Sequence, residues 1–406
     1  MYIERDLEKE LEKYGKRKEI IAIVGARQCG KTTLLNNFFL KLRNKNKKSI
    51  TFEDQKILDM FSNNIDLFIE TYVNGRDYLF IDEFQYAKNG GKQLKFIYDT
   101  CKIKIFITGS SAPDLAVHGL KFLVGRVFIF KLYPLSFSEF LKFKNKKLQE
   151  IYLKNDISKE LWIMLKKYYE EFLIYGGYPE VILSKTNEEK IKVLENIYNT
   201  YFLREIKEIL QLPDNFKLAK LIKILALQIG NLTNYSELSS STEYTNFELL
   251  KNLNVLKQTF ICIEARPFFT NKKKEIIKAP EFFFLDSGLR NILINNFQKL
   301  DERVDRGGLN ENFVASEIVK KDYELKYWRT KAKAEVDFIL EKNSEVIPIE
   351  VKSQLNDKKI TRSFRNFLEM YKPQKGFVLS YNLVGKMNVL ESMVNFRGIV
   401  DVGKII

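Results

Sequence analysis

Residues Gly25–Thr32 carry the spacing G-x-x-x-x-G-K-T, a pattern suited to holding a chain of phosphates. The apolar run Ile21–Val24 precedes it and a helical pattern follows, so strand, loop and helix come in the order that a phosphate-binding loop requires. The two glycines let the backbone curl with its N–H groups toward a phosphate, and the helix N-terminus adds partial positive charge. We therefore expect nucleotide binding here rather than a chance turn.

Two adjacent carboxylates end a second apolar run, Asp77–Glu83, 51 residues beyond Lys31. A buried strand that ends in two acids is costly unless a cation is present. We expect Asp82 and Thr32 to hold Mg²⁺ and Glu83 to polarise the attacking water as a general base. The alternative is a salt-bridged strand end. The residues expected to bind ATP with its Mg²⁺ are Gly25, Gly30, Lys31, Thr32, Thr33 and Asp82.

Polar residues also flank the next two apolar runs. Ile103–Ile107 leads into hydroxyl residues, of which Ser110 is expected to sense the γ-phosphate; the alternative is an ordinary helix cap. Arg126 precedes Val127–Phe130 and is expected to stabilise transferred phosphoryl charge, in cis or from a neighbouring subunit, unless it is a plain surface arginine. Strands that alternate with helices predict an α/β fold, a doubly wound parallel sheet with the nucleotide at its carboxyl edge.

Several motifs together resemble one family, the prokaryotic AAA-type P-loop ATPases, common in archaea, that carry a C-terminal restriction-endonuclease-like domain. The motifs are Gly-Ala-Arg-Gln-Cys-Gly-Lys-Thr-Thr-Leu-Leu (25–35), Ile-Asp-Glu-Phe-Gln (81–85), Thr-Gly-Ser-Ser (108–111), Gly-Arg (125–126), Leu-Tyr-Pro-Leu-Ser-Phe-Ser-Glu-Phe (132–140) and Tyr-Gly-Gly-Tyr-Pro-Glu (175–180). The resemblance covers nearly the whole chain. It implies an AAA-type core that uses ATP with Mg²⁺, a helical lid beside the nucleotide, and a winged-helix region after the lid.

The middle of the chain is predicted to contain a helix-turn-helix. Tyr235–Ser239 and Thr245–Leu256 are its expected second and third helices, and a hairpin with the basic tip Asn271–Lys274 follows. A winged helix places such a tip on a phosphate backbone. The alternatives are a solvated lysine turn and a winged helix that only joins domains. The predicted domains are residues 1–145 (ATPase core), 146–212 (helical lid), 213–300 (winged helix) and 301–406 (nuclease-like domain).

A second set of chemical groups lies on a predicted hairpin formed by Glu335–Leu340 and Val346–Lys352. Asp337 opens the first strand, and Glu350 and Lys352 share one face of the second because strand side chains alternate. An acid followed thirteen residues later by E-x-K is the pattern of PD-(D/E)XK nucleases. Asp337 and Glu350 are expected to bind Mg²⁺, while Lys352 positions the attacking water and stabilises developing charge.

A further metal ligand is expected from the helix before this hairpin. Glu311 shares a helical stripe with Val314 and Ile318 and should point inward, whereas Glu317 lies nearer the edge of the stripe. We therefore prefer Glu311. Two alternatives stay open, an amphipathic hairpin with a surface Glu–Lys pair and a nuclease fold that clamps DNA without cutting it.

Composition narrows the class of protein. The 406 residues are too many for one ordinary domain, and the net charge of +15 indicates either a polyanion partner such as DNA or a lysine-rich surface. Three dispersed cysteines and one histidine argue against disulfide frameworks, zinc sites and Ser–His triads. No apolar run reaches 18 residues and the first residues are charged, so we expect a cytoplasmic protein without a membrane span.

These observations favour a Mg²⁺-dependent ATPase coupled to a nuclease-like domain that acts on DNA. The alternative is an ATP-switched binding or signalling protein whose nuclease-like domain recognises nucleic acid without cutting it. The sequence leaves the oligomeric state open.

Overall fold

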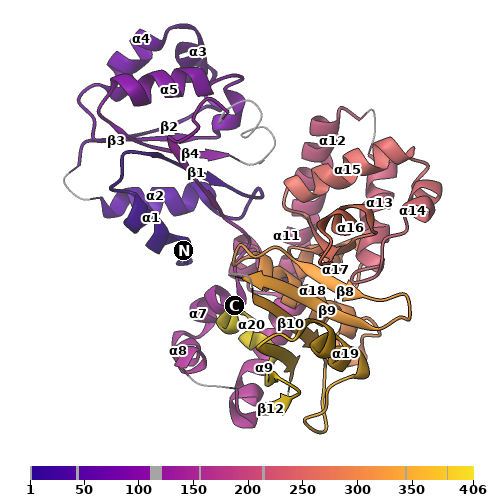
Figure 1. The fold of residues 1–406 in the computed structure, drawn as a ribbon. Coiled ribbons are helices and arrows are strands. Elements are labelled where there is room, and N and C mark those ends of the chain that lie inside the picture. Colours follow the sequence, from indigo (N-terminus) through magenta and orange to yellow (C-terminus); the bar gives the residue numbers. More distant parts are fainter. Residues whose placement is uncertain are drawn as a thin grey trace. The chain divides into compact units, whose positions relative to one another are not determined.

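The computed structural model describes residues 2–42, 45–109, 121–154, 157–212, 215–342, 345–381 and 383–406. The chain forms two units, Met1–Pro134 with Gln258–Phe260, and Leu135–Lys257 with Ile261–Ile406 (Figure 1). The first boundary lies earlier than the predicted residue 145. Helix α7 (Phe137–Lys144) belongs to the second unit because Phe137 and Phe140 pack against Phe172 of that unit.

The first unit is a five-stranded parallel sheet with strand order β2-β3-β4-β1-β5. The strands are β1 (Ile20–Val24), β2 (Lys47–Thr51), β3 (Tyr78–Asp82), β4 (Lys104–Gly109) and β5 (Val127–Lys131). The helical elements are α1 (Leu7–Tyr14), α2 (Lys31–Lys41), α3 (Gln55–Asn63), α4 (Ile65–Phe68), η1 (Ile69–Val73), η2 (Phe84–Tyr86) and α5 (Gly91–Thr100). The α/β parallel sheet expected from the sequence is confirmed.

Both faces of this sheet are covered, which explains why its central strands are apolar throughout. Figure 1 shows α1 and α2 on one face and α3 and α5 on the other. Along β1, Ile21 and Ile23 pack toward the α2 side, and Ile20 and Ala22 pack toward the α5 side. Because all five strands are parallel, the loop after β1 and the acids at the end of β3 lie at the same edge of the sheet, with β4 between them.

The second unit begins with a group of helices. They are α7, α8 (Lys146–Lys154), α9 (Lys159–Tyr175), α10 (Pro179–Leu183), α11 (Asn187–Asn196), η4 (Ile197–Phe202), α12 (Leu203–Leu210), α13 (Phe216–Leu227), α14 (Tyr235–Thr242), α15 (Asn246–Gln258), α16 (Lys272–Ile277) and α17 (Ser287–Leu293). The motif at residues 175–180 separates two helices, since Gly176 has φ +77° after α9 and Pro179 begins α10. Leu194, Leu221 and Leu253 share one core across α11, α13 and α15.

An eight-stranded mixed sheet follows, with strand order β12-β13-β11-β10-β9-β8-β6-β7. Its strands are β6 (Cys262–Pro267), β7 (Glu281–Phe284), β8 (Lys326–Arg329), β9 (Glu335–Lys342), β10 (Glu345–Val351), β11 (Lys375–Ser380), β12 (Gly385–Val389) and β13 (Ser392–Gly398). The remaining helical elements are η5 (Leu300–Glu302), α18 (Arg306–Val319), α19 (Arg362–Tyr371), η6 (Ile399–Asp401) and α20 (Val402–Ile405). After α18, the strands β8, β9 and β10 are antiparallel neighbours, and α19 leads to β11, which is parallel to β10.

The winged-helix region predicted for residues 213–300 is not confirmed. Helices α14 and α15 form where expected, and β6 pairs with β7 as a hairpin. However, β6 also pairs with β8, so the hairpin is the margin of the large sheet; every residue of β7 is buried. The predicted basic tip overlaps the first turn of helix α16, where Lys272 forms ion pairs with Glu275 and Glu341.

Among the described residues, no helix combines the length and the apolar character needed to cross a membrane.

Candidate functional sites

The loop between β1 and α2 has a backbone that only glycine permits at two positions. Gly30 has φ +93°, and a Cβ atom on Gly25 would lie 2.0 Å from the carbonyl oxygen of Leu132. Lys31, the first residue of α2, is buried and donates its Nζ to the carbonyl oxygens of Gly25 and Ala26, both at 2.9 Å. The loop therefore holds a buried ammonium group above its own backbone, at the N-terminus of a helix.

Two side chains hold this loop in shape through hydrogen bonds to its backbone and to the segment after β5. The buried Arg5 guanidinium donates from Nη1 to the carbonyl oxygen of Cys29 at 2.8 Å and from Nη2 to that of Tyr133 at 2.6 Å. The Cys29 thiol donates to the carbonyl oxygen of Ala26 at 2.8 Å. The segment before α1 and the segment after β5 thus fix the shape of the loop, a support that no sequence motif indicated.

Replacing Arg5 with alanine should raise the KM for ATP about tenfold and lower the melting temperature. The substitution leaves two buried carbonyl groups without their charged donor, at a cost of about 1–3 kcal/mol for each unsatisfied group. ATP-dependent phosphate release and thermal unfolding measure the two effects. Arg17→Ala is the matched control, because Arg17 is exposed and its guanidinium pairs with Glu19 and lies over the Phe128 ring rather than contacting the loop. Equal behaviour of the two variants would contradict this role for Arg5.

The acids at the end of β3 meet the loop as the sequence predicted. Thr32 donates from Oγ1 to Oδ2 of Asp82 at 2.8 Å. Thr108, at the end of β4, donates to the other carboxylate oxygen of Asp82 and accepts the backbone N–H of Glu83 at 3.2 Å. Glu83 has φ +54°, a conformation that few residues other than glycine adopt, and the Gln85 amide donates to its carboxylate. Thr108, the first of the hydroxyl residues that follow Ile103–Ile107, thus contacts both acids, although the sequence pointed to Ser110 as the sensor.

The three remaining predicted residues of the nucleotide site are Thr33, Ser110 and Arg126. Thr33 lies in the exposed first turn of α2, next to Thr32. Ser110 lies outside the described residues, so its sensor role stays a prediction. Arg126 precedes β5 and lies at the amino edge of the sheet, where it pairs with Asp99 at 2.9 Å.

The position of Arg126 excludes one of its expected roles. Val127 pairs with Ile20 at the start of β1, whereas the phosphate loop follows Val24 at the end of that strand. The strand between them is roughly 16 Å long, at about 3.3 Å per residue. The cis role is therefore wrong for this fold, because the arginine and the loop lie at opposite edges. A role from a neighbouring subunit stays a prediction.

The second candidate site is a cavity of about 260 Å³ in the C-terminal unit. Four carboxylate residues line it, Glu281 of β7, Glu311 of α18, and Glu335 and Asp337 of β9. Gly230, with φ +71°, also lines it, and a Cβ atom there would lie 2.8 Å from Oε2 of Glu311. Glu311 thus points into the cavity, as its helical stripe predicted.

The E-x-K pair lies beside this cavity. Lys352 Nζ is 3.0 Å from Oε1 of the buried Glu350, so the two side chains share a face as alternation predicts. The backbone N–H of Val351, between them, donates to Oδ2 of Asp337 at 2.7 Å. Thr361, the N-cap of α19, donates to the other oxygen of Glu350 at 3.1 Å. Strands β9 and β10 and helix α19 therefore hold these groups together.

Burial, with a smaller contribution from neighbouring like charges, raises the pKa values of three carboxyl groups in this site. Burial, together with the charges of Asp337 and Glu281, raises the pKa of Glu311 to about 8. Burial raises the pKa of Glu281 to about 8, and the charge of Asp337 adds to it while Arg329 opposes it. Burial also raises the pKa of Asp337 to about 6, although Lys352 and the Val351 N–H oppose the rise. A cation among these acids would relieve the cost that raises their pKa values.

For Lys352, the lysine of the predicted set, neighbouring charges outweigh burial in setting the pKa. Burial by itself lowers the pKa of Lys352, but Asp337, Glu350 and Glu311 outweigh it and hold the pKa above its usual value. The ammonium is therefore charged at neutral pH and interacts with all three predicted metal ligands.

Two further observations limit the site. Within the described residues, no three His, Cys, Asp or Glu side chains already stand in an arrangement that would hold a metal ion. Glu317, the rejected alternative to Glu311, is buried elsewhere, where it accepts the backbone N–H of Phe137 at 3.2 Å and pairs with Lys320 at 3.1 Å. Glu317 is thus a structural residue. Glu281, which sequence reasoning missed, lies on a strand with no motif around it.

Comparison with protein families divides the chain into three matched parts. Residues 17–141 match the family of the AAA domain. Residues 166–300 and 306–386 match two domains of unknown function, DUF8612 and DUF4143. The AAA-type ATPase domain expected from the sequence is therefore confirmed, and the restriction-endonuclease-like character of the C-terminal part is not.

Individual relatives give no function. An uncharacterized protein of Haemophilus influenzae is 28% identical over 281 residues, which are 68% of this chain and 65% of that protein, just under two thirds of its length. An uncharacterized protein of Methanocaldococcus jannaschii is 27% identical over 424 residues, covering 95% of this chain and 86% of its own. Among solved structures, a Walker-type ATPase of Pyrococcus abyssi has a TM-score of 0.46 at 15% identity, covering 72% of this chain and 96% of its own.

Proposed function

We propose that this protein is a Mg²⁺-dependent ATPase whose C-terminal unit hydrolyses phosphodiester bonds of DNA. The observation that carries the second half of this proposal is the geometry around Asp337, Glu350 and Lys352. Lys352 Nζ lies 3.0 Å from Oε1 of Glu350, and the intervening Val351 N–H donates to Asp337 at 2.7 Å. Glu311, which points into the adjoining cavity, completes the set that the sequence pattern and the family resemblance selected.

The ATPase half of the proposal is supported by the fit between the loop and a nucleotide. The loop that follows β1 provides a glycine-lined backbone, a buried ammonium on Lys31 and a helix N-terminus, which are the groups that bind phosphates. Thr32 and Asp82 supply hard oxygen ligands 2.8 Å apart, which suit Mg²⁺. Glu83, beside them, is the proposed general base, and Thr108 holds its backbone.

The nuclease half is supported by topology and by the chemistry of the donors. The order α18, β8, β9, β10, α19, β11 combines an antiparallel meander with a parallel crossover strand, as restriction-endonuclease-like domains do. Crowded, buried carboxylates with raised pKa values fit a divalent cation that would compensate their charge. We propose Glu311, Asp337 and Glu350 as its ligands. The proposed partner is DNA, in keeping with the net charge of +15.

The proposed reaction is the attack of water on phosphorus with cleavage of the P–O bond to the departing sugar oxygen, which takes up a proton. Mg²⁺, when bound, supplies the polarisation of the scissile phosphate. The Lys352 ammonium orients the attacking water and stabilises the charge that develops on the phosphate oxygens. The Val351 N–H and the Thr361 hydroxyl keep Asp337 and Glu350 in place as the charge changes.

Glu311→Gln should lower DNA cleavage by at least a hundredfold without lowering the melting temperature, because the amide keeps the shape of the side chain but cannot become the carboxylate that the cation would bind. The measurement is cleavage of labelled single-stranded, duplex and branched oligonucleotides by the full-length protein with Mg²⁺ or Mn²⁺, against EDTA. Glu391→Gln is the control, since Glu391 is exposed and pairs only with Lys372. Absence of cleavage by the wild type on every substrate would contradict the proposal and favour a non-cutting binding protein.

A further inference from the structure

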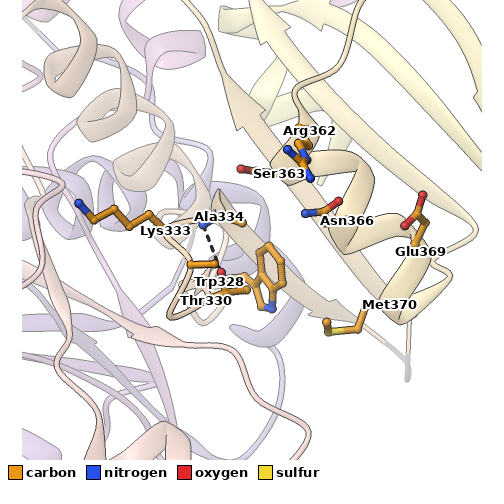
Figure 2. Close-up of a pocket in the computed structure, with 10 residues that line it drawn as sticks. Trp328, Thr330, Lys333, Ala334, Arg362, Ser363, Asn366, Glu369 and Met370 are labelled. Carbon is orange, nitrogen blue, oxygen red and sulfur yellow. Dashed lines mark hydrogen bonds between the residues drawn. The ribbon is translucent and has the colours of Figure 1, made fainter.

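We propose that a groove beside the carboxylate cavity binds a single strand of nucleic acid and leads it to that cavity. The groove lies between the turn that joins β8 to β9 and the helix α19, and it has a volume of about 760 Å³ (Figure 2). A concave space of this size takes one or two nucleotides of an unpaired strand but not a duplex. The inference rests on the proposed function of the neighbouring site and names its substrate class.

Positive charge stands on both walls of the groove. Lys333 lies on the turn and Arg362 at the first position of α19, and both line the groove and are exposed; the long Lys333 side chain, which extends outward in Figure 2, lies at the rim. In the parts of the chain that the structure describes, neither side chain forms a salt bridge. The N-terminus of α19 adds partial positive charge at the same end of the groove, while the acidic Glu369 lies further along the helix. This end of the groove therefore attracts phosphate groups.

The floor of the groove is apolar and fixed in position. Trp328 is 3% exposed, donates from its indole N–H to the Tyr371 hydroxyl at 3.3 Å and packs edge-on against Phe367. Thr330 accepts the backbone N–H of Ala334 at 3.1 Å, which holds the turn in shape (Figure 2). A rigid apolar floor below two cations suits bases and sugars that lie inward while phosphates lie along the rim.

Hydrogen-bonding groups complete the walls. Ser363 and Asn366 follow Arg362 along the groove-facing side of α19 (Figure 2). Their hydroxyl and amide groups can both donate and accept, so they can contact the edges of different bases. This composition favours binding of a strand with little sequence preference.

Both walls connect to the proposed catalytic residues. Trp328 lines the groove and also the carboxylate cavity, and the next residue, Arg329, pairs with Glu335 inside that cavity. On the other wall, Thr361 immediately precedes Arg362 and donates to Glu350 at 3.1 Å. Trp328 and the start of α19 thus adjoin both the groove and the proposed hydrolytic residues, which supports a path for a bound strand from one to the other.

The test measures binding of a fluorescent 12-nucleotide single-stranded DNA to the full-length protein in EDTA, where no cleavage occurs. Lys333→Glu and Arg362→Glu should each weaken binding at least fivefold and lower the slope of log affinity against log salt by about 0.7, the value for one phosphate contact with a single strand. Lys386→Glu is the matched control, an exposed lysine on β12 at the opposite end of the strand order. It should bind within twofold of the wild type.

A photo-crosslink from a thiothymidine in the same DNA provides a measurement that needs no substitution, and it should reach residues 328–334 or 362–370. Equal binding by the groove variants and the control, or crosslinks only elsewhere, would overturn the inference. These outcomes are independent of catalysis. A protein that binds DNA through the groove but never cuts it refutes the proposed nuclease and supports the groove. A protein that cuts DNA, and whose groove variants bind it as well as the wild type, supports the nuclease and refutes the groove.

Discussion

Lys31→Ala is expected to weaken ATP binding by at least a hundredfold and to abolish ATP turnover. The substitution removes the buried ammonium group that the loop holds against the carbonyl oxygens of Gly25 and Ala26. Charge-assisted contacts to phosphate contribute about 1.5–3 kcal/mol each, and two such contacts account for this loss. Titration with a fluorescent ATP analogue measures the affinity, and Lys56→Ala, an exposed lysine on α3, is the control.

Glu83→Gln separates binding from chemistry at the same site. Glutamine keeps the size of the side chain and leaves the backbone contact with Thr108 intact, so ATP affinity should stay within threefold of the wild type. Turnover should fall by about 10²–10⁴, the usual contribution of a general base. If Lys31→Ala binds ATP normally, or Glu83→Gln turns it over normally, the assigned nucleotide site is wrong.

Lys352→Ala is expected to remove metal-dependent DNA cleavage, at least a hundredfold, and to leave ATP turnover unchanged. The lysine interacts with Asp337, Glu350 and Glu311, so the developing charge on the phosphate loses a compensating charge in the variant. Cleavage of a labelled oligonucleotide and phosphate release from ATP are measured on the same preparation. Lys386→Ala is the control for a lysine on the same sheet.

A loss of folding is the competing explanation, because Lys352→Ala leaves the buried Glu350 without its partner at 3.0 Å. The double variant Glu350→Gln/Lys352→Ala removes that stranded charge and should melt near the wild-type temperature. Cleavage should be absent in both variants. Cleavage that survives in either of them at the wild-type rate would assign the activity to another site.

The ATPase half was predictable because its information is local. The loop Gly25–Thr32 and the acids Asp82 and Glu83 each lie within one short segment, and a parallel sheet brings the ends of its strands together whatever the intervening sequence. The cis role, one of the alternatives left open for Arg126, could not be judged from local sequence. Its strand was identified, but the edge from which the strand starts is set by β1 and β5 pairing in parallel.

The C-terminal half was predictable only in part. Alternation placed Glu350 and Lys352 on one face, and the helical stripe selected Glu311 over Glu317. The expected wing is not confirmed, because pairing between β6 and β8 joins segments about 60 residues apart, which no local pattern records. Glu281 and Arg5 were missed likewise, since each acts through contacts with residues distant in the sequence.

The most direct test of the central claim, two separate hydrolytic sites on one chain, follows ATP turnover and Mg²⁺-dependent DNA cleavage in the same samples of wild type, Glu83→Gln and Lys352→Ala. The account predicts that Glu83→Gln loses turnover and still cleaves in the absence of nucleotide, and that Lys352→Ala turns over ATP and does not cleave. Loss of the same activity in both variants, or wild-type cleavage by Lys352→Ala, would contradict it.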